Sequence, residues 1–447
     1  MKSRHRKRAR SLPDEAAPHA VTALEAAPEI VSEPVPEPQP EPVPSRPPGH
    51  RGVGRFFVRG TLVSLPLLLI LGFPTLILVM SGEVTPFADV ARRQWTSPNL
   101  VLFGLAESGP EMAYKLIATL MRKPKYLAMG SSRAMAYRSR FFRDSAGFYN
   151  SGGAVSGFRH FRQFLENIPE GQQPKIAILC FEQRYFNENV GHVMLHDYQE
   201  RLHEQPDRAR ILFDGFRDTY KKILVEKKYS MEQLFPVPLN HGYSMRQMIA
   251  SWRSMNKIGL MAIVNNNGYR NDGSYYYGKL IANPNSPDLW DYQFHDTLSR
   301  VDAGVSGFQY GEDIWKDALD EIRILLPYCR KRGIHVVAYL PPIAPTVLDR
   351  MKANGGYKYV PKIMPAAEPI FRENGFELYD FTDMRPYGSG DNEFIDGWHG
   401  SEKAYLRMFI LMAQNDPVLR AEVDLPALQQ RLAAAKSDYD VFGLDEY

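Results

Sequence analysis

The chain is poor in cysteine, with only Cys180 and Cys329 among its 447 residues. So few cysteines exclude the small disulfide-rich class of secreted proteins, and neither residue has the neighbours typical of a zinc or iron–sulfur site. Cys180 lies in an apolar, strand-like run and Cys329 near the end of a helical pattern, so we expect both to be buried as small hydrophobic side chains. A disulfide between them stays open, and no metal site is predicted.

The chain also lacks an excess of charge of either sign, because it contains 54 Lys and Arg residues and 51 Asp and Glu residues. A nearly neutral chain gives no electrostatic argument for binding to nucleic acid, and no nucleic-acid partner is predicted. The basic residues are unevenly placed, since seven Lys, Arg and His crowd into residues 2–10.

Residues 1–59 lack the apolar periodicity of a folded domain. Behind the basic head, residues 32–45 repeat proline with glutamate and valine. Prolines at this density prevent helix and sheet and favour a stiff, extended polyproline II conformation. We predict a disordered segment over residues 1–59 that acts as a spacer, with docking of a polyproline-binding partner as the alternative.

Long hydrophobic runs are absent except for one, residues 60–80, which contain no charged side chain. At about 1.5 Å per residue, a helix of this length covers the roughly 30 Å of a bilayer's hydrocarbon core. Pro66 and Pro74 are tolerated in spanning helices. A cleaved signal peptide is the alternative, but the segment before the run is far longer than a signal's basic region, and no small-residue cleavage site is evident. We therefore predict an uncleaved, single-pass anchor over residues 60–80.

The charges beside this run predict its orientation. Four arginines within residues 46–59 precede it, whereas Glu83 and Asp89 follow it. Because positive charge stays on the cytoplasmic side, residues 1–59 are expected in the cytoplasm and residues 81–447 outside it. In a bacterium, this arrangement is that of an inner-membrane protein with its main domain in the periplasm.

Beyond the anchor, apolar runs of strand length alternate with helical patterns. Strands are expected at residues 126–129, 147–150, 175–181, 334–340 and 377–381, and helices at residues 111–121, 312–332, 360–374, 401–414 and 425–435. This alternation predicts an α/β fold with a parallel five-stranded sheet covered by helices on both faces. Residues 190–310 fit no simple crossover and are predicted to be a large insertion that forms a cap or one wall of a binding cleft.

A serine turn follows the first predicted strand, where the sequence reads Gly130-Ser131-Ser132. In an open α/β sheet, this edge is where ligands bind, and free backbone N–H groups lie beside such a turn. A serine placed there can act as an acyl nucleophile. The alternative is that Ser131 or Ser132 only caps the helix that follows.

Two further loops carry residues that suit a serine nucleophile. Asp396 and His399 lie three residues apart after the fifth predicted strand, and can supply a general base with its orienting carboxylate. Residues 150–153 form a glycine turn after the second strand that can aim a backbone N–H at an oxyanion. A surface or helix-capping histidine and an ordinary turn are the alternatives.

Taken together, these motifs resemble blocks of the SGNH (GDSL-like) hydrolase superfamily. Gly130-Ser131-Ser132 stands where the family has Gly-Asp-Ser, and the single anchor with an exported domain is similar to the membrane-anchored DltD/AlgJ-like polysaccharide O-acyltransferase branch. The resemblance covers residues 120–185 and 315–415 and leaves the insertion unmatched.

The resemblance implies a flavodoxin-like α/β/α sandwich with Ser132 as nucleophile, His399 as base and Asp396 as its orienting carboxylate. It also implies an oxyanion hole formed by the amides of Ser132 and Gly152. The family's third block, usually Gly-x-Asn-Asp, is altered here to Glu-Gln-Arg-Tyr-Phe-Asn over residues 182–187, where Gln183 or Asn187 can supply the missing side-chain donor.

These observations lead to the expectation of an acyl transferase or esterase that acts on O-acyl groups, most simply acetyl, of a cell-envelope or secreted polysaccharide. No metal or diffusible cofactor is expected, and the resemblance implies a multi-span membrane O-acyltransferase as partner. We predict sugar contacts from Arg270, Asp272 and Tyr275, with a packed or solvated loop as the alternative. A non-catalytic scaffold or polysaccharide-binding subunit of an export complex is the alternative for the whole chain.

Overall fold

The structure, a computed structural model, describes residues 51–106, 111–191, 197–234, 247 and 255–444. The chain divides into two units, Met1–Leu62 and Val63–Tyr447, and the second contains both sheets. Residues 1–50, which make up most of the segment predicted to be disordered, lie outside the described residues.

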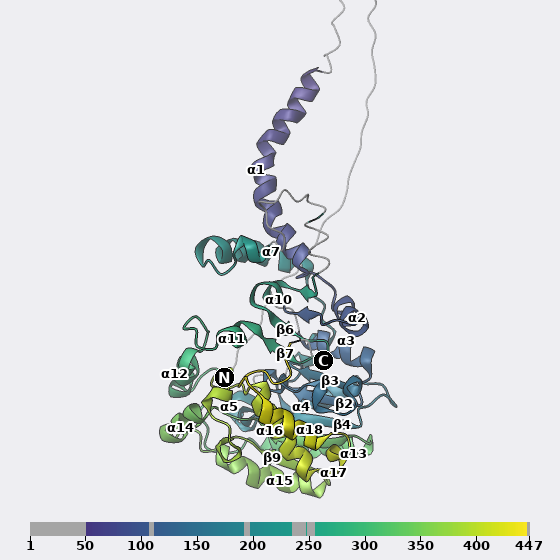
Figure 1. The fold of residues 1–447 in the computed structure, drawn as a ribbon, viewed down its shortest axis with the longest axis vertical. Helices are drawn as coiled ribbons and strands as arrows, with labels where there is room; N and C mark the ends of the chain where they lie inside the picture. Colours follow the sequence, from purple (N-terminus) through teal and green to yellow (C-terminus); the bar gives the residue numbers. More distant parts are fainter. Residues whose placement is uncertain (1–50, 107–110, 192–196, 235–246, 248–254, 445–447) are drawn as a thin grey trace, which may run out of the picture. The chain divides into compact units, whose positions relative to one another are not determined.

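A five-stranded, all-parallel sheet forms the centre of the larger unit (Figure 1). Its strands lie in the order β3 (Phe148–Gly152), β2 (Tyr126–Gly130), β4 (Ile176–Cys180), β8 (His335–Leu340) and β9 (Glu377–Asp380). Numbered along the chain within this sheet, the order is 2-1-3-4-5, which is that of flavodoxin-like doubly wound sheets. The predicted α/β fold with a parallel five-stranded sheet is therefore confirmed.

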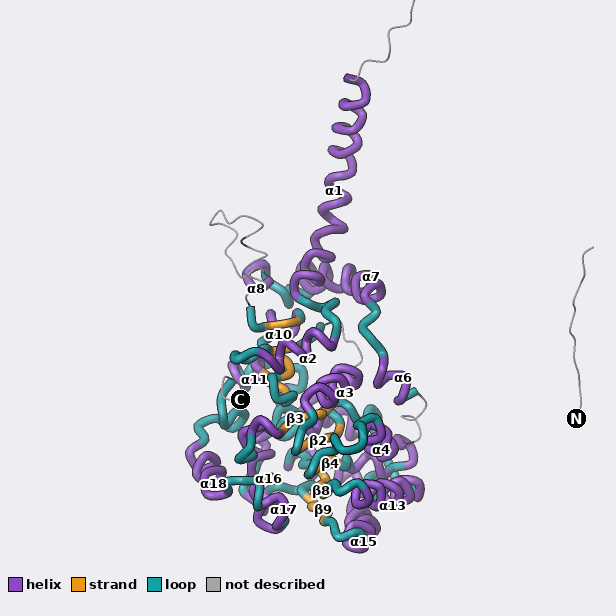
Figure 2. Tube along the Cα trace, turned by 90° about the vertical axis from the view of Figure 1, so that its right-hand side faces the viewer, coloured by secondary structure: helices purple, strands orange, loops and turns teal. Residues whose placement is uncertain are grey.

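Helices cover both faces of this sheet, because successive side chains of each strand point to opposite sides. In β2, Leu127 and Met129 join one apolar core, whereas Tyr126 and Ala128 join the other. The first face is covered by α3 (Glu111–Arg122), α4 (Phe158–Glu166), α13 (Lys316–Lys331) and α15 (Ile363–Glu373), and the second by α16 (Glu402–Asn415) and α18 (Leu425–Ala434). Figure 2 shows the strands between these two layers.

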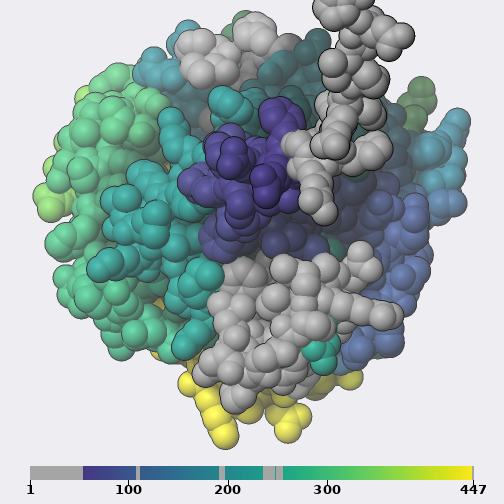
Figure 3. Space-filling model, turned by 90° about the horizontal axis from the view of Figure 1, so that it is seen from above, coloured from purple at the N-terminus to yellow at the C-terminus, as the bar shows by residue number. Residues whose placement is uncertain are grey.

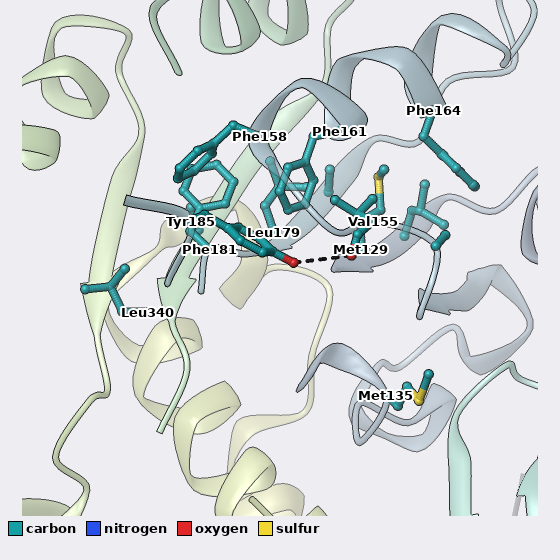
Figure 4. Packing of buried hydrophobic residues seen from close by; sticks show 14 of the residues in the cluster. Met129, Met135, Val155, Phe158, Phe161, Phe164, Leu179, Phe181, Tyr185 and Leu340 are labelled. Atoms are coloured by element: carbon teal, nitrogen blue, oxygen red, sulfur yellow. Dashed lines mark hydrogen bonds between the residues drawn. The ribbon is translucent and has the colours of Figure 1, made fainter. Parts of the chain in front are cut away.

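The first core is rich in aromatic rings, as Figure 4 shows. Phe158 and Phe161 of α4 each place a ring 5.0 Å from the ring of Phe181, which follows β4. The hydroxyl of Tyr185 donates to the carbonyl oxygen of Val155 at 3.3 Å, the dashed line in Figure 4. This packing holds the loops after β3 and β4, which lie next to the serine turn.

A second, mixed sheet was not predicted. Its strands lie in the order β5 (Lys257–Ile258), β1 (Leu102–Phe103), β6 (Asn267–Tyr269) and β7 (Tyr275–Tyr277). β1 pairs in parallel with β5, and β6 pairs antiparallel with both β1 and β7. Strands of two or three residues are too short to show alternation, and β1 comes from outside the predicted insertion. Three strands of the insertion therefore form one sheet together with β1, from an earlier segment of the chain.

The remaining helices are short and lie mainly in the connections. They are α2 (Phe87–Thr96), α5 (Glu188–Gly191), α6 (Tyr198–His203), α7 (Arg208–Tyr220), α8 (Met231–Leu234), α10 (Leu260–Asn265), α11 (Gly278–Ala282), α12 (His295–Ala303), α14 (Pro345–Asn354) and α17 (Pro417–Arg420).

The N-terminal helix α1 (Arg51–Ser81) begins earlier than the predicted span. Residues 51–59 were expected to be disordered, but no proline interrupts them, so the backbone hydrogen bonds of the apolar run continue toward the N-terminus. Within the described residues, α1 is the one helix that is long and apolar enough to cross a membrane, over Gly54–Ser81.

The two cysteines are buried free thiols in β4 and α13, so the disulfide left open by the sequence is not formed. Burial raises the pKa of Cys180 and of Cys329 to about 12, so both thiols stay protonated at neutral pH.

Candidate active site

The serine turn is fixed by close packing at the end of β2. A Cβ atom on Gly130 would lie 2.6 Å from the Cβ of Cys180 on the neighbouring strand, so only glycine fits there. Ser131 then caps a short 3₁₀ helix, because its Oγ accepts a hydrogen bond from the backbone N–H of Arg133 at 3.1 Å. The capping role predicted for either serine thus falls to Ser131, and the hydroxyl of Ser132 is left for another partner.

That partner is His399. The Oγ of Ser132 lies 2.8 Å from Nε2 of His399, and Nδ1 of His399 lies 2.7 Å from Oδ2 of Asp396. The three residues predicted to act together are therefore brought into one hydrogen-bonded chain. The side chain of Asp396 is 2% exposed and that of His399 is 18% exposed, so the carboxylate is buried and the imidazole is reached by solvent.

The second carboxylate oxygen of Asp396 fixes the loop around the histidine. Oδ1 accepts the backbone N–H groups of Trp398 and His399, both at 2.7 Å. Burial alone would raise the pKa of Asp396, but the adjacent His399 and the hydrogen bonds from its ring and from the two N–H groups lower it below its usual value. Asp396 is thus an ionised carboxylate that holds the ring with its Nδ1–H toward Oδ2.

The loop that carries Asp396 and His399 is also held by the insertion. The carboxylate of Asp291, which is buried, accepts the backbone N–H of Gly397 at 3.0 Å and the hydroxyl of Thr297 at 2.6 Å. Sequence reasoning missed this contact because Asp291 and Gly397 are far apart in the chain, and no local motif marks Asp291.

The triad lies at the topological switch point of the sheet. Ser132 follows β2, and Gln183 follows β4, the neighbour on the other side from β3. In doubly wound sheets the strand order reverses between these two strands, and the crevice at their carboxyl ends binds the ligand.

Among the predicted oxyanion donors, the backbone N–H of Ser132 differs from the others. In the described part of the chain this N–H has no protein acceptor. The N–H of Gly152 instead donates to Oδ1 of Asn150 at 2.7 Å. Asn150 is fully buried, and its Nδ2 donates to the carbonyl oxygens of Ala134 and Tyr137, both at 2.9 Å. Asn150 therefore ties the end of β3 to the segment that follows the serine turn.

The side-chain amides of Gln183 and Asn187 are also engaged within the protein. Nε2 of Gln183 donates to the carbonyl oxygen of Pro341 at 2.7 Å and to Oγ1 of Thr382 at 2.9 Å. Nδ2 of Asn187 donates to the carbonyl oxygen of Gln309 at 2.7 Å. In this conformation, neither side chain offers an unused N–H group to a substrate.

Arg133, directly after the serine, is a further residue that sequence reasoning missed. Its guanidinium group is buried, lies 4.1 Å from the centre of the Trp398 ring, and donates to Oε1 of Gln183 at 2.9 Å and to the carbonyl oxygen of Pro342. Glu182 balances its charge; burial would raise the pKa of this carboxyl, but Arg184 and Arg133 lower it to about 2. Arg133 thus connects the ends of β2, β4 and β8 with the histidine loop.

Arg270 and Asp272, predicted to contact sugar, lie in a buried ion-pair cluster. Nη1 of Arg138 lies 2.5 Å from Oε2 of Glu402, and its Nε lies 3.4 Å from Oδ2 of Asp272. Nη2 of Arg270 lies 3.6 Å from the same oxygen of Glu402. All four side chains are 5% exposed or less, so the cluster joins the insertion to α16 rather than facing solvent.

Removal of Arg138 should destabilise the fold strongly. In Arg138→Met, two buried carboxylates keep only Arg270 as a counter-charge, and breaking a buried pair costs about 3–5 kcal/mol. Urea unfolding of the detergent-solubilised chain, followed by tryptophan fluorescence, measures this loss. Arg159→Met removes a half-exposed surface pair with Glu321 and should cost less than about 1 kcal/mol. Equal midpoints for the two variants would contradict the expectation.

Tyr275 lies closer to the serine turn. Its backbone N–H donates to the carbonyl oxygen of Met135 at 2.9 Å, which docks β7 onto the segment after Ser132. The ring of Tyr275 lies 4.7 Å from that of Tyr277, and both are half-buried. Burial raises the pKa of Tyr277, and the charges of Tyr275 and Asp396 add to this.

A buried lysine braces the same region. Nζ of Lys115, on α3, donates to the carbonyl oxygens of Asn150 at 2.9 Å and of Gly273 at 2.5 Å. It lies 3.8 Å from the centre of the Tyr269 ring. Lys115 therefore links the end of β3 to the turn that carries Asp272. No sequence pattern distinguished it from the other lysines of the helices.

The free energy of unfolding should depend on pH because of Lys115. Burial lowers its pKa from 10.5 to about 7, although Glu111 and Asp272 act in the opposite direction. Between these values the unfolded chain binds one proton more than the folded chain, so stability rises with pH, by up to about 1.4 kcal/mol per pH unit. The difference in urea midpoint between the wild type and Lys115→Met, measured from pH 7 to pH 8.5, isolates this slope. A difference that does not change with pH would contradict the lowered pKa of Lys115.

The comparisons with known proteins leave the site to be judged by its geometry. Neither models of protein families nor curated proteins match the chain. Among the described residues, no group of three or more His, Cys, Asp or Glu side chains is arranged to hold a metal ion.

Proposed function

We propose that the chain is a membrane-anchored acyltransferase or esterase that forms an acyl-enzyme on Ser132. One observation carries this proposal, the continuous hydrogen-bonded chain from Ser132 through His399 to Asp396. A surface histidine or a plain helix cap requires no such chain. A buried carboxylate, an accessible imidazole and a hydroxyl at hydrogen-bond distance are the components of nucleophilic acyl transfer.

In the first half-reaction, Nε2 of His399 takes the proton of the Ser132 hydroxyl as Oγ forms a bond to the acyl carbon. The electron pair of the carbonyl moves to its oxygen, next to the backbone N–H of Ser132. When this intermediate collapses, the bond to the donor's oxygen or sulfur breaks, and that atom takes the proton from His399. Asp396 stabilises the imidazolium throughout and keeps it oriented.

In the second half-reaction, a sugar hydroxyl or water gives its proton to Nε2 of His399 and attacks the acyl carbon. The bond to Ser132 Oγ breaks, and the serine recovers the proton from His399. The acyl group thus passes to the acceptor without a metal or a diffusible cofactor.

The setting of the reaction follows from the anchor and the motif order. The arginines before the apolar run and the acidic residues after it support an N-terminus in the cytoplasm and a domain in the bacterial periplasm. The resemblance to the DltD/AlgJ-like branch of the SGNH superfamily supports O-acyl groups, most simply acetyl, of a cell-envelope or secreted polysaccharide as substrates. A multi-span membrane O-acyltransferase would supply the acyl group from the cytoplasm.

A second candidate function is a non-catalytic scaffold or polysaccharide-binding subunit. One observation favours this candidate: the N–H groups of Gly152, Gln183 and Asn187 all donate hydrogen bonds to acceptors within the protein. Each missing oxyanion donor costs about 3 kcal/mol of transition-state stabilisation. In an active enzyme, the same observation argues against fast hydrolysis and is compatible with slow transfer.

An activated acetyl ester separates the two functions. The purified protein should gain one acetyl group by intact mass, and peptide mapping should place it on Ser132. Release of acetate follows if water serves as acceptor. Without an adduct and without acetate release, the scaffold replaces the enzyme as the better proposal.

A further inference from the structure

Helix α7 and the residues after it form an amphipathic segment outside the active site. The segment Arg208–Lys228 contains seven Lys and Arg residues but only three Asp and Glu residues. Large apolar side chains on this segment are unusually exposed, at 81% for Phe213, 68% for Leu224 and 74% for Val225. Monomeric soluble proteins rarely leave such a group uncovered, so it marks an interaction surface.

The buried and the exposed sides of α7 are opposite faces of one helix. Ile211, Gly215 and Thr219 recur every four residues and are buried. Phe213 follows Ile211 by two residues, about 200° around the helix, and so lies on the opposite face. Leu224 and Val225 lie in the π-helical turn Lys221–Val225 that continues α7. The segment is therefore held on the domain by one side and presents an apolar stripe on the other.

The middle of this stripe packs against the second half of α1. The hydroxyl of Tyr220 donates to the carbonyl oxygen of Ile70 at 2.7 Å, and its ring stacks on Phe73 with 6.2 Å between centres. In the space-filling view, the surface atoms coloured teal, which include α7, lie directly beside the purple helix (Figure 3). The exposed apolar ends of the stripe thus lie at the level of Ile70–Phe73.

Exposure along α1 changes at this same level. The large apolar side chains from Phe56 to Leu71 are mostly exposed, whereas Ile77 and Leu78 are fully buried in the domain. The exposed part, residues 54–72, contains an uncharged portion, residues 60–72, that is about 20 Å long as a helix. Arg55 and Arg59 precede this portion, and their long side chains can reach the cytoplasmic headgroups. The part of α1 that lipid can surround therefore ends where α7 docks.

We propose that Arg208–Lys228 lies on the surface of an anionic lipid bilayer and fixes the membrane plane near Ile70–Phe73. Phe213, Leu224 and Val225 would enter the boundary between headgroups and acyl chains, and the basic side chains would pair with lipid phosphates. The inference rests on α1 as the membrane anchor and is independent of the chemistry at Ser132. Contact of Arg208–Lys228 with the bilayer would fix the distance between the domain and the membrane. A linker alone would not fix this distance.

Site-specific labelling of the full chain tests this placement. Because Cys180 and Cys329 are buried, a polarity-sensitive thiol dye reacts at an introduced cysteine. Phe213→Cys and Leu224→Cys are reconstituted in phosphatidylglycerol–phosphatidylethanolamine liposomes, with and without brominated lipid. Both dyes should be quenched by brominated lipid and protected from iodide in the water. Ile324→Cys, half-exposed on α13, is the matched control and should show the reverse.

A positive control in the anchor keeps the outcomes distinct. A dye at Leu68→Cys should be quenched by brominated lipid; if it is not, the anchor fails and the inference falls with it. If Leu68→Cys is quenched but the dye at position 213 behaves like that at position 324, the surface placement alone is overturned. A dye at position 213 that is protected in native membranes, but not in liposomes of the pure protein, would show that a protein partner covers the stripe instead of lipid.

Discussion

Ser132→Ala is expected to lower the turnover of an activated acetyl ester by about 10⁴- to 10⁶-fold and to abolish the covalent adduct. The substitution removes the only hydroxyl that lies 2.8 Å from Nε2 of His399 in the described part of the chain. Alanine leaves the backbone N–H of residue 132 in place, so binding of the ester should persist while bond formation stops. Burst kinetics and intact mass measure the two effects separately.

Ser131→Ala is the matched control for this substitution. Ser131 is the chain neighbour of Ser132 and is buried, but its Oγ caps the 3₁₀ helix and does not contact the histidine. Loss of the cap should cost about 1 kcal/mol of stability and leave the adduct at residue 132. An adduct that survives in Ser132→Ala, or disappears only in Ser131→Ala, would move the nucleophile away from Ser132.

Asp396→Asn should reduce kcat by about 10⁴-fold without disturbing the fold. The reason lies in the two backbone N–H groups that Oδ1 accepts at 2.7 Å, those of Trp398 and His399. They require an acceptor at that position, so the new amide must turn its NH₂ group toward Nδ1 of His399. The ring is then forced into the tautomer with hydrogen on Nε2, which cannot take the proton of Ser132.

The pH profile and a control in the same loop check this explanation. Asp391→Asn, a side chain that within the described residues accepts hydrogen bonds from Thr346 alone, should leave kcat unchanged. The pKa of Asp396 is already below its usual value, so loss of activity on mild acidification in the wild type should not come from protonation of this carboxylate. A decrease of less than about tenfold in Asp396→Asn would show that Asp396 does not orient a catalytic base.

Local patterns were sufficient to predict the central sheet. Each of its strands lies within a residue or two of its predicted position. Glycine ends β2 and β3, Pro341 follows β8, and Asp380 ends β9. The same patterns placed Ser132, Asp396 and His399 at loop positions that the structure brings together. Parallel strands make this possible, because their carboxyl ends meet at one edge of the sheet.

Contacts between distant segments could not be predicted in this way. β1 and β5 are two residues long and pair across more than a hundred residues, so neither shows a strand pattern by itself. Sugar contact by Arg270 and Asp272 is predicted from the neighbouring tyrosine rings, whose flat apolar faces and polar edges suit a sugar. Their ion-pair partners Arg138 and Glu402 lie elsewhere in the chain, so no local pattern indicates the buried cluster. Burial of a charge depends on the whole fold, which a single sequence does not reveal locally.

The hydrogen bond that the N–H of Gly397 donates to Asp291 matters for how distant relatives are recognised, because it joins two parts of the sequence that no single motif contains. A homologue could retain the serine turn and the histidine loop letter for letter and still have lost this brace through a deletion in the middle of its sequence. Shared motifs would then overstate shared activity. Whether the brace has been inherited together with the two loops is then the better guide to whether a relative shares the proposed reaction.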